Sequence, residues 1–385
     1  MRIYKAYKFR MYPSKEQIKK LNSYLGSKRF IYNNYLAKKE QSLKEKVSFN
    51  LNDMKKDLLI LKQECEWLKE IDSCILRTSL EDLENAYKRF YQNHGEKPKF
   101  KKKNHKESYR TVCNRSLYND TLYTSIKVDL EKRTIKLPKL DEIKIKGYRN
   151  LESFSHKIIN ATVSKEAGRY YVSVCVEEEI PSMKFIPKNI IGIDVGIKDL
   201  IVCSDGIKYS KIRGIKVQER RIKGLQKALS RCEKNSKNRQ KIIQKISRCY
   251  QKIKNMRKYC IHEITTKLVK ENDIIVTETL KVKQMIMEGK NNLAKHISNA
   301  SFSEILRQLA YKTKWHNKKL YQVNPYYPSS QICSHCGKQN KKVKDLNIRV
   351  WECPSCQFMN DRDLNASINI MDKGFEMFVK EQYSN

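Results

Sequence analysis

The sequence predicts a multidomain protein of the α+β and α/β classes, with a β region and a helical bundle in its first half and a mixed α/β domain in its second. The chain has 385 residues, enough for two or three ordinary cores. Strand-like alternation flanks a long helical stretch before residue 182, and short apolar runs alternate with helical patterns after residue 188. Four clustered cysteines then interrupt the second half just before a last amphipathic helix.

The charge of the chain indicates a polyanionic partner. Lys and Arg number 80 against 42 Asp and Glu, a formal net charge of +38, and such a chain repels itself unless nucleic acid neutralises it. The most apolar stretches have only the length of strands, so we expect neither a membrane span nor a membrane partner. The N-terminus lacks the apolar core of a signal peptide and most cysteines are scattered, which predicts a reducing, cytoplasmic location.

The first half contains a predicted strand, a helical bundle and a later β region. Residues 1–13 alternate in polarity like a half-buried strand, and Pro13 ends it. Ser14 and Gln17 form a capping-box signal, after which apolar residues recur at helical spacing, so residues 14–93 are predicted as a small helical bundle. Residues 125–178 are predicted as β structure, and the clearest hairpin turns at Gly168.

A basic segment with one aromatic residue ends the helical stretch. Six lysines fall between residues 97 and 106. Such a segment is often only a solvated loop, but the overall charge favours contact with phosphates. The candidate nucleic-acid contacts are Lys97, Lys99, Phe100, Lys101, Lys102 and Lys103.

Residues 188–331 predict the first part of an α/β domain, after a linker near 182–188. An apolar strand ends at Asp194, and two further strands follow around an Asp-Gly turn. Residues 211–258 carry eighteen Lys and Arg against two Glu at helical spacing, which predicts a basic helical hairpin facing a polyanion. A later buried strand ends at Glu278.

The clustered cysteines predict a structural zinc site in a ribbon spanning residues 332–357. Two Cys-x2-Cys pairs are separated by sixteen residues, which is zinc-ribbon spacing. Four thiolate ligands close the coordination shell, so no bound water remains to be activated. Unliganded thiols are the less favoured alternative, and His335 is interpreted as a surface or phosphate contact. The predicted ligands are Cys333, Cys336, Cys353 and Cys356.

Three carboxylates predict a second metal centre. Asp194, Glu278 and Asp363 are individually unremarkable, since such residues often cap turns or face solvent, and an acid in the first turn suits a helix N-terminus. Their order along the chain, however, is that of an RNase H-like sheet holding two Mg²⁺ ions for phosphodiester hydrolysis. Asp361 would point away from these ligands and is assigned as the helix N-cap or as a residue supporting the site.

Several motifs together resemble the TnpB (OrfB-type) proteins of insertion sequences, which are related to type V CRISPR effectors. The resemblance rests on "YKFRMYPSKEQ", "RFIYNNYL", "KPKFKKK", "GIDVGIKDLIVCSDG", "IIVTETLKVKQM", "YPSSQICSHCGKQN" and "WECPSCQFMNDRDLNASINI", which span almost the whole chain. The last stretch is the most specific, because it places Asp-Arg-Asp-x-Asn-Ala directly behind a cysteine knuckle. "TETL" and "NASIN" depart from the commoner family pattern without touching a proposed ligand.

The resemblance implies a two-lobed, RNA-guided DNA endonuclease. It implies a wedge-like β domain of residues 1–13 and 112–182 with a helical recognition domain, residues 14–111, inserted into it. A RuvC-type RNase H fold would follow, which the zinc ribbon interrupts and residues 358–385 complete. The family's catalytic acids fall on Asp194, Glu278 and Asp363, and Arg307 lies where the family has a basic residue near the scissile phosphate. The implied partners are a guide RNA from the transposon end and a double-stranded DNA target, and the implied cofactors are structural Zn²⁺ and two catalytic Mg²⁺ ions.

Two other functions remain open at this point. A DNA-binding accessory factor or repressor of transposition would bind targets without cutting them, although loss of an acid would favour that function and none is lost. A transposase that transfers strands would use the same fold and metals, so residue chemistry alone does not exclude it.

Overall fold

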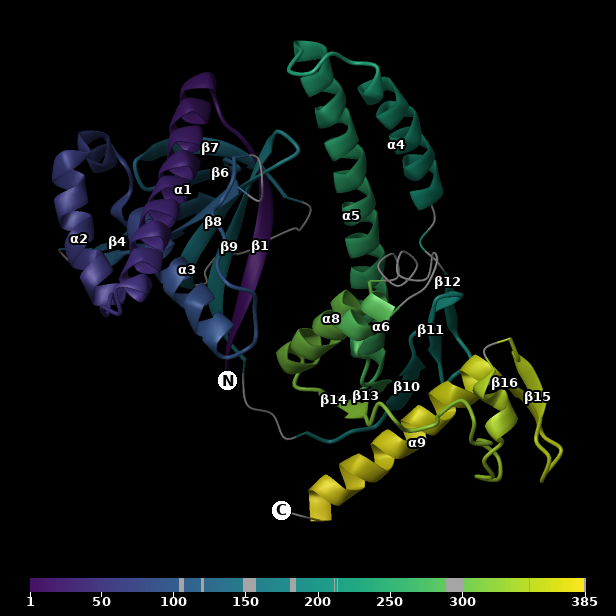
Figure 1. The fold of residues 1–385 in the computed structure, drawn as a ribbon. Helices are drawn as coiled ribbons and strands as arrows, with labels where there is room; N and C mark the ends of the chain where they lie inside the picture. Colours follow the sequence, from purple (N-terminus) through teal and green to yellow (C-terminus); the bar gives the residue numbers. More distant parts are fainter. Residues whose placement is uncertain are drawn as a thin grey trace. The chain divides into compact units, whose positions relative to one another are not determined.

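The computed structural model divides the chain into two compact units, Met1–Ile180 and Pro181–Asn385. It describes residues 1–103, 107–118, 121–147, 157–180, 185–210, 212, 214–288, 301–345 and 347–383 (Figure 1). The predicted linker falls partly on residues 181–184, which lie outside the described residues. None of the helices in these ranges is both long enough and apolar enough to span a bilayer.

The first unit is built on a seven-stranded sheet with the order β2-β8-β9-β1-β7-β6-β5. Strand β1 lies in its interior and pairs antiparallel with β9 from Arg2–Glu179 to Met11–Tyr170, because both strands alternate inward apolar and outward polar residues. A separate hairpin joins β3 to β4. The strands are β1 (Arg2–Tyr12), β2 (Glu107–Val112), β3 (Arg115–Tyr118), β4 (Thr121–Thr124), β5 (Lys127–Asp129), β6 (Thr134–Leu137), β7 (Leu140–Lys146), β8 (Lys157–Glu166) and β9 (Arg169–Glu179).

Helices of this unit share one hydrophobic core with the sheet. They are α1 (Lys15–Lys44), α2 (Leu51–Glu64), the 3-10 helix η1 (Glu66–Glu70) and α3 (Ser73–Tyr91). The capping box predicted at Ser14 and Gln17 begins α1, with both reciprocal hydrogen bonds present.

The implied end of the helical domain, residue 111, lies inside a strand. Strand β2 begins at Glu107 and pairs with β8. Tyr109 and Thr111 face inward along this strand. Thr111 donates a hydrogen bond to Asp72, the N-cap of α3, so the strand is tied to the helices that precede it. The lysine-rich residues before it hide this short alternation in the sequence.

The second unit contains a five-stranded mixed sheet with the order β12-β11-β10-β13-β14. The first three strands in sequence, β10 (Ile190–Asp194), β11 (Asp199–Cys203) and β12 (Lys208–Ser210), form the predicted antiparallel meander. Strands β13 (Ile274–Glu278) and β14 (Lys319–Val323) extend the sheet in parallel with β10. The carboxyl ends of β10, β13 and β14 therefore lie at one edge.

Helices cover both faces of this sheet (Figure 1). Ile275 of β13 packs with α5 and α8, whereas its neighbours Ile274 and Val276 pack on the opposite face with Ile370 of α9. The helices are α4 (Ile215–Ser230), α5 (Lys237–Glu271), α6 (Val282–Glu288), α8 (Phe302–Trp315) and α9 (Arg362–Tyr383). Helices α4 and α5 form the predicted basic hairpin, held by a small core at Ile222 and Ile253.

The cysteine-bearing segment has a core of its own. It contains the 3-10 helix η2 (Lys341–Lys344) and a two-stranded sheet of β15 (Val350–Glu352) and β16 (Met359–Asp361). Trp351 and Val343 pack against Cys333 and Cys353. Strand β16 runs directly into α9, so the ribbon is joined to the start of that helix.

Candidate active site and metal centre

Asp194 and Glu278 lie side by side at the carboxyl edge of the sheet. Strands β10 and β13 are parallel neighbours, and Ile193 pairs with Thr277. The next residue of each strand is the acid, so both carboxylates emerge at the same level. Sequence position alone could not show this pairing, because it depends on the strand order.

Helix α9 brings Asp363 to this edge by crossing β10 very closely. A Cβ atom added at Gly192 would lie 2.1 Å from the carbonyl oxygen of Ser367 and 2.6 Å from the amide nitrogen of Met371. Only a glycine allows this approach. Asp363 lies about one helical turn before Ser367, which carries its carboxylate toward the end of β10.

Burial and like charge make the acidic edge electrostatically unfavourable by itself. Burial, followed by the charges of Glu278 and Asp363, raises the pKa of Asp194 to about 7. Burial also raises the pKa of Glu278, against a hydrogen bond from Ser329 that lowers it. Glu278 and Asp363 thus raise the pKa of Asp194, and these three acids are called the acidic cluster below. Repulsion among their carboxylates would favour a bound cation.

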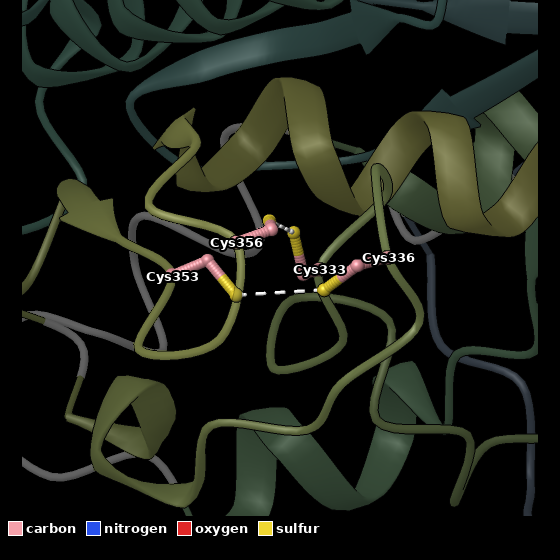
Figure 2. Close-up of side chains that lie close together, drawn as sticks. All are labelled: Cys333, Cys336, Cys353 and Cys356. Atoms are coloured by element: carbon pink, nitrogen blue, oxygen red, sulfur yellow. Dashed lines mark hydrogen bonds between the residues drawn. The ribbon is translucent and has the colours of Figure 1, made fainter.

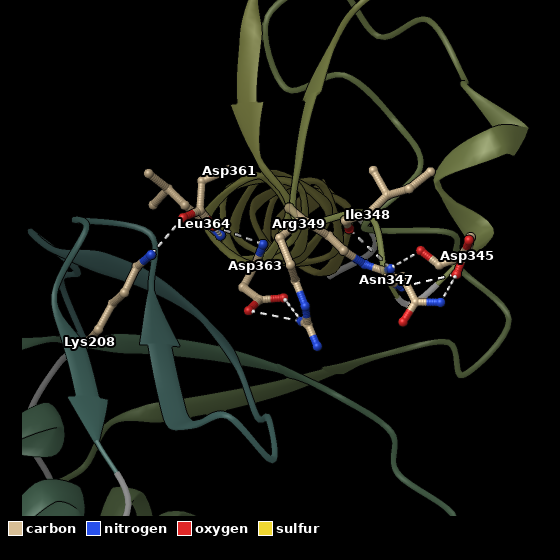
Figure 3. Close-up of polar contacts among 9 residues, drawn as sticks. Lys208, Asp345, Asn347, Ile348, Arg349, Asp361, Asp363 and Leu364 are labelled. Carbon is tan, nitrogen blue, oxygen red and sulfur yellow. Dashed lines mark hydrogen bonds and ion pairs between the residues drawn. The ribbon is translucent and has the colours of Figure 1, made fainter.

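Asp361 caps α9 and pairs with the meander (Figure 3). Its Oδ1 accepts hydrogen bonds of 3.1 Å from the backbone N–H groups of Asp363 and Leu364. Its Oδ2 lies 2.6 Å from the ammonium of Lys208 on β12. Although burial acts in the opposite direction, Lys208 and these N–H groups lower the pKa of Asp361. Asp361 therefore fixes the start of the helix that bears Asp363.

Two arginines that the sequence did not mark as site residues lie near the start of α9. The guanidinium of Arg349, from the segment before β15, lies 3.3 Å from Asp363 Oδ1 (Figure 3). Arg362 is the middle residue of the Asp-Arg-Asp motif, and its side chain is buried. It donates hydrogen bonds to the carbonyl oxygens of Asp345 and Ile348. The motif thus combines a cap, an anchor for the ribbon and a candidate ligand in three successive residues.

The four predicted cysteines converge in the ribbon (Figure 2). Within the described ranges, they are the only His, Cys, Asp or Glu group of three or more whose ligand atoms all lie within 4.8 Å of one another. The Sγ atoms of Cys333 and Cys356 are 3.7 Å apart, and those of Cys336 and Cys353 are 3.6 Å apart. Sulfurs about 2.3 Å from a tetrahedral zinc ion would be separated by about 3.8 Å, so the cluster fits Zn²⁺.

Backbone donors prepare this cluster for a cation. The N–H groups of Cys356 and Ser355 lower the pKa of Cys353 to about 6. For Cys356 the N–H of Phe358 acts in the same direction, but burial and the neighbouring sulfurs raise its pKa to about 12. Cys356 therefore ionises at neutral pH only when a positive ion lies close to its sulfur. His335 stacks on Phe358 at the surface of the ribbon instead of joining the cysteines.

Arg307 is held within its own helix. Its guanidinium makes two hydrogen bonds, of 2.8 and 2.7 Å, to Glu304 and lies 5.3 Å from the ring centre of Tyr311, all on α8. Its side chain is 59% exposed. The contacts described for Arg307 join it to α8 and not to the three acids.

The predicted basic segment is not uniform. The exposed members are Lys97, Lys99, Phe100, Lys102 and Lys103, although Lys97 pairs with Glu40 and Lys99 with Glu96. Lys101 instead lies 3.4 Å from the ring centre of Tyr32, and burial, followed by the charge of Lys28, lowers its pKa to about 8. In this structure Lys101 therefore packs against α1, and the exposed members are the better placed for phosphate contacts.

Three family models match successive parts of the chain. "Helix-turn-helix domain" matches residues 1–47, "Probable transposase" matches residues 173–288, and "Cas12f1-like, TNB domain" matches residues 302–370. The first stretch consists here of strand β1 and the single long helix α1, not of two short helices. The third contains α8, the cysteine cluster and the start of α9.

Curated relatives match nearly the whole chain. "Putative RNA-guided DNA endonuclease InsQ" of Escherichia coli (strain K12) is 30% identical over 390 residues, covering 97% of this chain and 93% of that protein. The chain belongs to the TnpB (OrfB-type) family. Another family member, "Putative RNA-guided DNA endonuclease" of Streptomyces pristinaespiralis, is 30% identical and covers 96% of this chain and 89% of that protein.

The fold is also similar to that of a protein in a solved complex. The protein chain in "Cryo-EM structure of the Cas12f1-sgRNA-target DNA complex" superposes with a TM-score of 0.57 at 15% sequence identity. The match covers 96% of this chain and 99% of that one. At this identity, the likeness shows that the TnpB-family chain shares a mixed α/β fold with that effector.

Proposed function

We propose that this TnpB-family chain is an RNA-guided, Mg²⁺-dependent DNA endonuclease with an RNase H-like, RuvC-type catalytic domain. The observation that carries the proposal is the placement of Asp194, Glu278 and Asp363 at one edge of the sheet, where two of them raise the pKa of the third. Support for the RNase H-like assignment comes from the antiparallel meander β10-β11-β12 followed by the parallel strands β13 and β14.

The three acids are proposed as ligands of two divalent ions. Carboxylate oxygens suit Mg²⁺, which when bound in pairs activates a water molecule and stabilises the leaving oxygen of a phosphodiester. Asp194 and Glu278 would hold their positions through the parallel strands, and Asp363 through α9 and the Asp361 cap. Asp363 would have to release Arg349 before it could bind a metal ion.

The remaining candidate residues have supporting roles in the proposal. Cys333, Cys336, Cys353 and Cys356 would hold a structural Zn²⁺, and Arg307 would move from Glu304 to neutralise charge on the scissile phosphate. The exposed members of the basic segment, Lys97, Lys99, Phe100, Lys102 and Lys103, would contact the nucleic-acid backbone or bases.

A guide RNA and a DNA target are the proposed partners. The net charge of +38 favours a polyanionic partner, and the two relatives described above are named as RNA-guided. Base pairing would then read the target sequence while the protein holds backbone and shape. We further propose that the guide is transcribed from the end of the parent transposon.

Cleavage of double-stranded DNA by the purified ribonucleoprotein tests the proposal. The gene is expressed with its native flanking DNA, the co-purifying RNA is sequenced, and a matching target is incubated with Mg²⁺. Asp194→Ala and Asp363→Ala should each reduce the cleavage rate by at least about 100-fold, while Glu352→Ala, exposed on β15, should leave it unchanged.

Three results would contradict this assignment. Cutting that survives both aspartate substitutions would place the active site elsewhere. Tight guided binding without cutting would favour a repressor or accessory factor. Joining of transposon ends in a strand-transfer assay would favour the activity named in the matching model "Probable transposase".

A further inference from the structure

Glu278 receives a hydrogen bond from a buried serine outside the acidic cluster. Ser329 lies between β14 and the first cysteine, and its side chain is almost fully enclosed, with 5% of the residue exposed. Its Oγ donates to Glu278 Oε1 at 2.5 Å. The two residues are 51 positions apart in sequence, so this contact depends on the tertiary fold.

Two asparagines on α9 hold the backbone of the segment that carries this serine. Asn369 Nδ2 donates to the carbonyl oxygens of Ser329 and Ile332, both at 2.7 Å. Asn365 Nδ2 donates to the Ile332 carbonyl at 2.7 Å, and its Oδ1 accepts from the N–H of Ser334 in the first cysteine knuckle. Both asparagines are buried, Asn365 with 2% and Asn369 with 4% of the residue exposed, and they lie one helical turn apart.

We propose that Ser329 is a positioning residue that orients Glu278 for divalent-metal binding. A glutamate has three rotatable side-chain bonds, so its carboxylate requires an external partner to hold one orientation. The Ser329 hydroxyl donates its hydrogen bond to Oε1 of Glu278 and leaves Oε2 of Glu278 available to a cation. Hydrogen-bond partners that hold a metal ligand typically change metal affinity or activity by about 10- to 100-fold when removed.

Asn365 and Asn369 link the position of Ser329 to helix α9. Helix α9 carries Asp363 in its first turn and, through Asn365 and Asn369, fixes the backbone on which Ser329 is mounted. One helix therefore delivers Asp363 directly and sets Glu278 through Ser329. The same contacts hold the entrance of the cysteine ribbon, because Ile332 and Ser334 flank Cys333.

The inference rests on the proposed function, because it assumes that Glu278 binds a metal ion. Its test uses the full-length, zinc-loaded protein and titration calorimetry with Mn²⁺ as the probe, alongside Mg²⁺ titrations of cleavage. Ser329→Ala should raise the Mn²⁺ dissociation constant and the Mg²⁺ concentration for half-maximal cleavage by about 10- to 100-fold. High Mg²⁺ should restore much of the rate.

Conservative and neighbouring variants separate orientation from general destabilisation. Ser329→Thr keeps a hydroxyl and should bind Mn²⁺ within about threefold of wild type, as should Ser330→Ala at the adjacent, less buried position. Zinc content and the melting temperature of the protein without Mn²⁺ should match the wild type in every variant. Unchanged Mn²⁺ affinity in Ser329→Ala, or equal losses in the Ala and Thr variants, would overturn the inference.

The same titrations distinguish failure of the inference from failure of the proposed function. If Asp194→Ala binds Mn²⁺ as the wild type does, the acidic cluster is not the metal site and both proposals are wrong. If Asp194→Ala loses binding but Ser329→Ala does not, only the role of Ser329 is overturned. A fall in zinc content or melting temperature that accounts for the lost affinity would make Ser329 a structural residue and would also overturn it.

Discussion

At Asp194, burial and two neighbouring acids lower the stability of the folded protein at neutral pH. Its pKa is about 7 in the folded chain, raised from 3.8 by burial and by Glu278 and Asp363. The folded state therefore holds the proton more tightly than the unfolded state. This group's contribution makes the free energy of unfolding fall as pH rises from about 4 to about 7, after which it changes no further.

Asp194→Asn should therefore stabilise the protein in the absence of divalent metal while abolishing cleavage. Above pH 7 the gain in unfolding free energy should be about 1–3 kcal/mol, and it should vanish near pH 4. Urea unfolding of the zinc-loaded protein at a series of pH values, in buffers without added Mg²⁺ or Mn²⁺, measures this gain. Asp141→Asn, exposed on β7, is the control and should show no gain that grows with pH. A pH-independent difference for Asp194→Asn would contradict the electrostatic explanation.

At the scale of elements, the crossing of α9 over β10 sets the distance between Asp363 and Asp194. Gly192 permits this crossing because its missing side chain leaves room for the helix backbone at Ser367 and Met371. A second glycine, Gly374, performs the same role further along α9, where an added Cβ would lie 2.2 Å from a side-chain carbon of Val276. The backbone atoms at Gly192 cannot move aside as a flexible side chain can.

Gly192→Ala should push α9 away from the sheet, lowering the free energy of unfolding by about 2–4 kcal/mol and cleavage by at least about tenfold. Gly224→Ala is the matched control, because that glycine lies in α4 with no heavy atom within 4 Å of an added Cβ. The control should gain about 0.5–1 kcal/mol through helix propensity. Chemical denaturation and cleavage rates measure both. Wild-type stability in Gly192→Ala would show that the helix does not require this close approach.

At the scale of the whole molecule, the cysteine ribbon and the acidic cluster are physically connected. Arg362 anchors the segment at Asp345 and Ile348, Asn365 holds the first knuckle, and both arginine and asparagine belong to the helix that carries Asp363. Folding of the ribbon should depend on a metal ion held by its cysteines, since neighbouring thiolates repel one another without a cation between them. Loss of that ion should therefore disturb the edge of the sheet that carries the three acids as well as the ribbon.

Cys353→Ser should lose the zinc, lower the melting temperature of the second unit and reduce cleavage together. Atomic absorption, thermal unfolding and cleavage assays measure the three effects. Cys232→Ser, at the end of α4, removes a thiol outside the cluster and should retain zinc and activity. Full cleavage by Cys353→Ser after loss of zinc would show that the ribbon does not position Asp363.

Local pattern was sufficient for several elements. The alternation of residues 3–11 predicts β1, the Ser14–Gln17 pair predicts the start of α1, and the cysteine spacing predicts the cluster that the structure forms. Each signal operates over a few residues. Strand β2 was missed because only its six residues alternate, between a basic segment and a longer β region.

By itself, the sequence determined the chemistry available to this protein: a strongly basic chain, four thiols in paired knuckles, and acids at the ends of strands and at the start of a helix. Only the tertiary structure decided which of these groups meet. The parallel pairing of β10 with β13 places Asp194 beside Glu278, and the close crossing at Gly192 brings in Asp363. It also revealed Arg349 against Asp363 and Ser329 against Glu278. Such contacts join distant parts of the chain, and no local periodicity encodes them, because they arise only when the sheet and α9 pack together.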